Sequence, residues 1–271
     1  MEQLWHPRSM LLATLVRRCT AGSAPEGLRP ATHLLWFCDA MLLFFALPWL
    51  LLRVLGVDPA LYIGAEIGAT LFFLGAYVYV TRPEVLRWRQ RSAVLVSLGL
   101  GAVCVIVLVV LVVSGVDRTG RPQGGGLVLA LAWRGIADGS TTALLLGVFP
   151  AVVAREMART APGRAERWMR LVLSFVMVWT LSAAHHLGFE QYDDRSLVPV
   201  EVTTTLAGLP VIVSGNPAGT IVAQAALHIV VVLEGYETDA IVPPQRDLVR
   251  DYVPPGVFRP DEVMPGGSFP S

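Results

Sequence analysis

Two adjacent histidines, His185 and His186, lie in an apolar stretch, where their imidazole rings could carry protons or bind a metal ion. Because a helical turn takes about 3.6 residues, adjacent side chains point about 100° apart, so both rings should not face one site. His186 is four residues from both Ser182 and Glu190, so we expect His186 rather than His185 to share a face with other polar groups. Alternatively, the two histidines lie at the membrane interface and are simply solvated. A metal site would need a further ligand from elsewhere in the chain.

A polar ladder follows, in which Asn216, Thr220, Gln224 and His228 are each four residues apart among aliphatic neighbours. Residues four apart point in nearly the same direction on a helix of 3.6 residues per turn, so the four side chains form one polar stripe. In a membrane the stripe must face protein or water, as hydrogen bonds between helices or as the wall of a substrate cavity. Pro217 interrupts the helix just before the stripe. The N–H groups that this leaves free could bind an anion or a carbonyl oxygen.

Ionisable residues also occur in other apolar segments, although a charge near the centre of a membrane helix costs about 2.5–3.5 kcal/mol. Glu66 lies in one segment, and Arg134 and Asp138 lie one helical turn apart in another. Such residues usually pair with one another inside the bundle, so we expect Arg134 to form an ion pair with Glu66 or with Asp138. The pair either fixes the helix register or supplies an acid that serves as a base, a proton carrier or a ligand-binding charge.

Together these residues predict a polar cavity inside the membrane. Its candidate catalytic groups are Glu66, Asp138, His186 and His228. The residues expected to line it or to bind a substrate are Arg134, His185, Glu190, Asn216, Thr220 and Gln224. No histidine pair has the His-Glu-x-x-His spacing of a zinc site and the three cysteines lack metal-ligand spacing, so we assign no metal and identify no cofactor.

The composition indicates an integral membrane protein. Of 271 residues, 54% are hydrophobic and 15% are charged, with a mean hydropathy of +0.58. A soluble domain carries about 25% charged residues. The net charge is zero, which argues against a nucleic-acid partner and leaves the lipid bilayer as the expected environment. All basic residues are arginine, a bias we attribute to a GC-rich bacterial genome.

The apolar runs predict an all-α, polytopic membrane bundle with about six spans. Their approximate bounds are His33–Leu52, Ala60–Val80, Ala93–Val113, Leu127–Val153, Trp168–Leu187 and Val202–Leu233. The third run is almost purely aliphatic and predicts an outer helix that faces lipid. The last run would reach ~48 Å as one straight helix, whereas the hydrocarbon core is only ~30 Å thick. With Pro210 and Gly215-Asn216-Pro217 inside it, we expect this segment to be broken or partly re-entrant.

Arginines orient the chain in the membrane. The N-terminal segment holds four, residues 81–92 hold four and residues 155–170 hold five, whereas the alternate loops together hold four. This bias predicts a cytoplasmic N-terminus in a bacterial plasma membrane. We expect three parts: an N-terminal segment (1–31) with an interfacial amphipathic helix, the transmembrane bundle (32–234), and a Pro/Gly-rich, largely disordered tail (235–271).

Residues 127–233 resemble the bacterial CAAX-protease and bacteriocin-processing membrane family. That family has a Glu-Glu-x-x-x-Arg motif, then a Phe-x-x-x-His motif, then a histidine on a third helix. Here Leu181-x-x-x-His185 or Ser182-x-x-x-His186 stands at the second motif, and His228 stands at the third. At the first motif the chain departs from the family, because Trp133-Arg134-Gly135 and Asp138 offer one arginine and one acid in reverse order.

Three classes of function stay open at this point. The resemblance implies an intramembrane hydrolase with Glu66 or Asp138 as the base and His186 and His228 as ligands or oxyanion stabilisers. A small-solute or ion transporter or channel would use the broken last segment for its cargo. A membrane scaffold or assembly protein, with a membrane-protein partner or a second copy of the chain, would use the polar groups only for packing.

Overall fold

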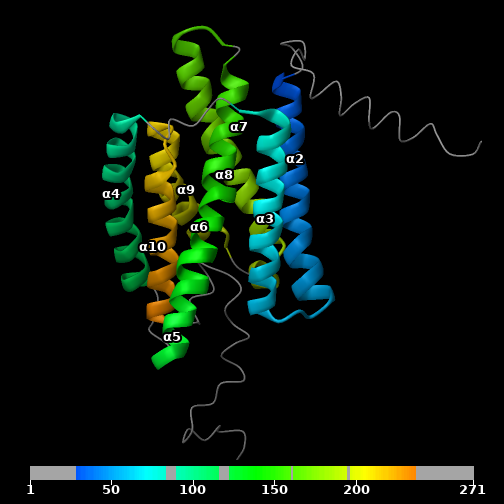
Figure 1. Cartoon of the computed structure of the whole chain (residues 1–271), viewed down its shortest axis with the longest axis vertical. Helices are drawn as coiled ribbons and strands as arrows, with labels where there is room; N and C mark the ends of the chain where they lie inside the picture. Colours follow the sequence, from blue (N-terminus) through cyan, green and yellow to red (C-terminus); the bar gives the residue numbers. More distant parts are fainter. Residues whose placement is uncertain (1–28, 84–89, 116–121, 160, 194–195, 236–271) are drawn as a thin grey trace, which may run out of the picture.

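The computed structural model describes residues 29–83, 90–115, 122–159, 161–193 and 196–235, and every regular element in these ranges is helical (Figure 1). Five helices are long and apolar enough to cross a membrane, and two shorter apolar helices pack with them. The predicted all-α membrane bundle is therefore confirmed. The expected N-terminal surface helix and the Pro/Gly-rich tail lie outside the described residues.

The first two spans form an antiparallel pair. Helix α2 (Arg29–Pro48) continues into the π-helical segment η2 (Trp49–Val54), and α3 (Pro59–Thr81) returns across the bundle. Asp58 begins α3, since its Oδ1 accepts a hydrogen bond from Ala60 N at 2.8 Å and the next residue is a proline. Aromatic side chains pack α2 and α3 against the middle of the bundle, with Phe73 edge-to-face on Phe149 at 5.5 Å.

Helix α4 (Arg91–Gly115) lies at the edge of the bundle and exposes most of its aliphatic side chains. One narrow stripe on it is buried, at Ala93, Ser97, Gly101, Cys104, Leu108 and Val112. The stripe packs against α9 and α10. The predicted outer helix is thus observed, with a single face turned inwards, and its contact with lipid stays a prediction.

The fourth span runs through the centre of the bundle as one continuous helix of 34 residues, Gly125–Ala158. Along it α-helical and π-helical segments alternate: α5 (Gly124–Ala130), η3 (Leu131–Asp138), α6 (Gly139–Thr142), η4 (Ala143–Val148) and α7 (Phe149–Ala158). At ~1.5 Å per residue the span is ~51 Å long, so it extends beyond a hydrocarbon core of ~30 Å. π-Helical turns are frequent at functional sites, and here one of them ends at Asp138.

The last predicted segment is broken, as expected, and the break reverses the direction of the chain. After α8 (Arg164–Leu187) and the short η5 (Glu190–Tyr192), two helices of 17 residues follow, α9 (Val198–Ser214) and α10 (Ala218–Glu234). Gly215, at φ +71°, makes the turn. Figure 1 shows α9 and α10 side by side, and Thr220 Oγ1 on α10 accepts a hydrogen bond from Val211 N on α9 at 3.0 Å. The two helices therefore form a hairpin.

We expect Thr220→Val to weaken this hairpin by about 1 kcal/mol, because Val211 N loses its buried hydroxyl partner. Thr220→Ser keeps the hydroxyl and is the matched control. Unfolding of the purified protein in mixed micelles, followed with increasing denaturing detergent, measures the difference. Equal stability of the valine and serine variants would show that the hydrogen bond contributes nothing.

Candidate functional site

Glu66 and His185 form a buried pair between α3 and α8. The Nε2 atom of His185 lies 3.3 Å from Oε1 of Glu66, and the two residues are 4% and 6% exposed. The other ring nitrogen, Nδ1, lies 3.3 Å from the carbonyl oxygen of Phe44 on α2. Both ring nitrogens thus face oxygen acceptors. The contacts are satisfied either by an imidazolium beside a carboxylate or by a neutral ring beside a protonated Glu66, so one proton is shared by the pair.

Asp138 and His228 form a second buried pair, between η3 and α10. The Nδ1 atom of His228 lies 3.3 Å from Oδ2 of Asp138. On the opposite side of the ring, the amide nitrogen of Gln224 lies 3.4 Å from Nε2. If the amide N–H of Gln224 donates, Nε2 accepts, and Nδ1 faces the Asp138 carboxylate without a hydrogen bond in the described part of the chain.

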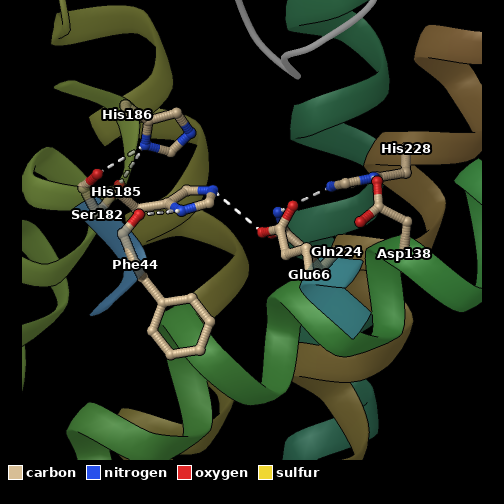
Figure 2. A network of polar contacts seen from close by, with 8 residues as sticks. All are labelled: Phe44, Glu66, Asp138, Ser182, His185, His186, Gln224 and His228. Atoms are coloured by element: carbon tan, nitrogen blue, oxygen red, sulfur yellow. Dashed lines mark hydrogen bonds and ion pairs between the residues drawn. The ribbon is translucent and has the colours of Figure 1, made fainter. Parts of the chain in front are cut away.

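The two pairs are neighbours in one network. Figure 2 shows Glu66 between His185 on one side and Gln224, His228 and Asp138 on the other. Ionisable groups from α8, α3, η3 and α10 thus gather in one part of the interior.

Both adjacent histidines lie inside the bundle, so the alternative of a solvated interfacial pair is wrong. His186 is 4% exposed, and its Nδ1 lies 2.7 Å from the carbonyl oxygen of Ser182. Its ring centroid is 5.0 Å from that of His185. The expected contact between His186 and Ser182 is present, with Ser182 Oγ 3.3 Å from Nδ1, but Glu190 is exposed and His185 faces polar groups as well. Because α8 packs against α2, α7 and α9, side chains 100° apart both point into protein, and His185 is the one that meets a carboxylate.

The four residues of the polar ladder make two different kinds of contact. Gln224 and His228 belong to the buried network, whereas Asn216 and Thr220 hold the α9–α10 hairpin. Asn216 Oδ1 accepts a hydrogen bond from Ala218 N at 3.0 Å. The start of α10 therefore does not offer the free N–H groups that the break predicts, because side chains already occupy them.

The next N–H of α10 is occupied by a side chain from α4. Ser97 Oγ accepts from Gly219 N at 2.9 Å and donates to the carbonyl oxygen of Asn216 at 2.7 Å. A single hydroxyl thus ties α4 to the turn of the hairpin. Nothing in the sequence around Ser97 indicates this contact, since an isolated serine in an aliphatic run usually bonds its own helix.

Of the other predicted cavity residues, Glu190 lies outside the network and Arg134 is buried on the same helix as Asp138. Glu190 begins η5 and is exposed, outside the buried network. Arg134 is buried in η3, one turn before Asp138. The carboxylates of Glu66 and Asp138 each lie against a histidine. The ion pair expected between Arg134 and one of them stays a prediction.

Sequence reasoning missed one buried acid close to the network. Glu201 on α9 is 4% exposed, and it faces Ser182 of α8, although neither carboxylate oxygen makes a hydrogen bond in the described part of the chain. An acid in the first turn of a helix, after a proline, is typical of a helix start. The sequence therefore gives no sign that Glu201 is also buried close to the network. Ser182 thereby stands between Glu201 and the His186 ring, 3.3 Å from its Nδ1.

The described residues bring together no group of three or more His, Cys, Asp or Glu side chains that could hold a metal ion. Two cavities are lined by residues of α7, α8 and α9 and of the loop before α8, and neither touches the buried network. A metallopeptidase site needs at least three converging protein ligands. The geometry therefore gives no support to a metal-dependent hydrolase.

Comparison with known proteins assigns no family to the chain, so the description of the site rests on its geometry. No family model matches the sequence, and neither the curated proteins nor the solved structures include a significant match. The resemblance to the CAAX-protease family thus gains no support. What the chain shows is a multi-pass helical membrane protein with buried polar and charged residues.

Proposed function

We propose that this protein is a membrane transport protein that moves protons, with the Glu66–His185 and Asp138–His228 pairs as its proton carriers. The observation that supports this most strongly is the arrangement of the two pairs. Two carboxylates and two imidazoles, contributed by four different helical segments, meet in the interior of an otherwise apolar bundle. Ionisable residues at such depth are costly and typically mark ion or proton pathways.

The chemistry of the network suits a proton better than a larger cargo. Carboxylates and imidazoles can each accept and release a proton, and in each pair a proton can sit on either partner. The network is closely packed, and the two cavities lie away from it. A proton needs only a chain of groups within hydrogen-bonding reach or one water apart, whereas a solute needs an open route.

Two features of the fold support movement around the network. The π-helical segment that ends at Asp138 is a place where a helix can shift its register locally. His228 lies on α10, which the turn at Gly215 joins to α9, so a movement of the α9–α10 hairpin would displace His228 relative to Asp138. Because arginine-rich loops tend to stay in the cytoplasm, we infer that the α7–α8 junction lies on the cytoplasmic side of a bacterial plasma membrane.

A flux measurement with the full chain in liposomes tests this function. A potassium gradient with valinomycin makes the lumen negative, and a trapped pH dye reports proton entry. We expect the wild-type protein to acidify the lumen faster than protein-free vesicles do. Asp138→Asn keeps the shape of the side chain and removes its charge, so it should slow the entry about tenfold, which corresponds to about 1.4 kcal/mol on the barrier.

The matched control is Glu190→Gln, an identical kind of charge removal at an exposed acid outside the network. It should leave the flux at the wild-type rate. Wild-type vesicles that acidify no faster than empty ones, with the protein correctly inserted, would rule out proton transport.

A further inference from the structure

A second polar region lies at the end of the bundle where α7 meets α8 and where the α9–α10 hairpin turns. There a cavity of about 560 Å³ is bounded by the beginning of α8 and the end of α9. Arg167 and Arg170 of α8 line it, with Ser214 of α9 and one acid, Glu166. Its volume falls in the range of pockets that hold small ligands, about 300–1,000 Å³.

Arg155 extends this basic surface across the hairpin turn. A smaller, adjoining cavity is lined by Arg155, Arg170, Ser174 and Gly215. The guanidinium of Arg155 packs directly over the turn, with Nη1 2.6 Å from the position that a Cβ on Gly215 would take. Glycine is thus needed twice there, for its positive φ and for the space that the guanidinium fills.

Arg170 is the residue that points most directly to a ligand. It lines both cavities, and its Nε is buried without a hydrogen-bond partner in the described part of the chain. An unsatisfied buried donor is costly, and for a charged group the cost is higher still. An acceptor oxygen bound in the cavity would satisfy it.

The residue types around this region are those found at a membrane surface. It is at the arginine-rich end of α8, and Trp168, two residues before Arg170, is 68% exposed. Tryptophan and arginine together are typical of the level of the lipid headgroups. Basic pockets between transmembrane helices at this level bind phosphate-containing headgroups.

We propose that Arg155, Arg167 and Arg170 form a binding site for a phosphate-bearing anion. Arg167 and Arg170 line the larger cavity with one acid, Glu166, so basic groups outnumber acidic ones there, and guanidinium forks match the oxygens of a phosphate. The phosphate belongs either to an anionic lipid headgroup or to a small soluble phosphate. The site is separate from the buried network and does not depend on proton transport.

Native mass spectrometry of the full chain in detergent tests the site with three probes: phosphatidylglycerol, uncharged diacylglycerol and inorganic phosphate. We expect the wild type to retain phosphatidylglycerol and not diacylglycerol, and Arg170→Gln to weaken this binding about tenfold. Arg91→Gln is the matched control. It removes an exposed arginine at the start of α4, the end that Ser97 ties to the hairpin turn, without touching either cavity.

The probes separate the two sources of phosphate. Binding of inorganic phosphate that the Arg170 substitution abolishes supports the site with a soluble ligand, and binding of phosphatidylglycerol alone supports a lipid headgroup. If Arg170→Gln does not fold, Arg167→Gln at an exposed arginine replaces it. Equal binding of phosphatidylglycerol by the wild type and the cavity variants, or equal binding of diacylglycerol, overturns the proposal.

Discussion

Gly101→Ala is expected to destabilise the bundle by about 1–3 kcal/mol, because it separates α4 from α10. A Cβ on Gly101 would lie 2.7 Å from the Cα of Gly219 and 2.8 Å from its carbonyl oxygen. Both atoms belong to the backbone, so no side chain can rotate away to make room. The converse contact is closer still, since a Cβ on Gly219 would collide with the carbonyl oxygen of Ser97.

Gly99→Ala provides the matched control for this prediction. Gly99 lies on the same helix, and a Cβ there would meet nothing within 4 Å. Alanine is also the better helix former, so this variant should be as stable as the wild type or slightly more stable. Unfolding in mixed micelles compares the two variants. An equal loss of stability in both variants would mean that the stability of the bundle depends on the number of glycines in α4 rather than on close packing at Gly101.

Most of the fold could be predicted because each span is a local property of the sequence. An apolar run near twenty residues identifies a membrane helix whatever its neighbours are, and the almost purely aliphatic sequence of α4 predicts a helix at the edge of the bundle. The reversal at the hairpin could not be predicted in this way. Gly215, Asn216 and Pro217 indicate an interruption, but a kink and a turn begin with the same residues. The contacts from Thr220 to α9 and from Ser97 to the turn decide between them, and the second joins residues 119 apart in the sequence.

The candidate site could likewise be predicted only in part: its residues could be selected from the sequence, but their contacts could not. Glu66, Asp138, His185 and His228 could be selected from the sequence, because an ionisable residue in an apolar run stands out by itself. Their pairing could not, since it depends on how α3 packs against α8 and η3 against α10. The sequence predicted the contact of His186 with Ser182 and missed the polar partner of His185 for a related reason. A helical wheel assumes one buried face, and α8 is covered on several sides.

Removing both carboxylates is expected to abolish proton transport. The single variant Asp138→Asn leaves the Glu66–His185 pair able to exchange its proton. With Glu66→Gln added, no carboxylate remains beside either histidine, and amide side chains cannot take up a proton at neutral pH. The flux of the double variant should therefore fall to that of protein-free vesicles.

The same double variant separates transport from a purely structural role. Gln and Asn keep the volume of Glu and Asp and can still donate or accept hydrogen bonds, so the packing between α3, α8, η3 and α10 should persist. If the network only holds the helices together, any loss of flux should follow a loss of thermal stability. If the protein is a scaffold, the double variant should therefore be less stable than the wild type. We expect the opposite, a correctly inserted protein that unfolds close to the wild-type temperature and carries no protons, since the proton-accepting atoms and not the contacts have been removed.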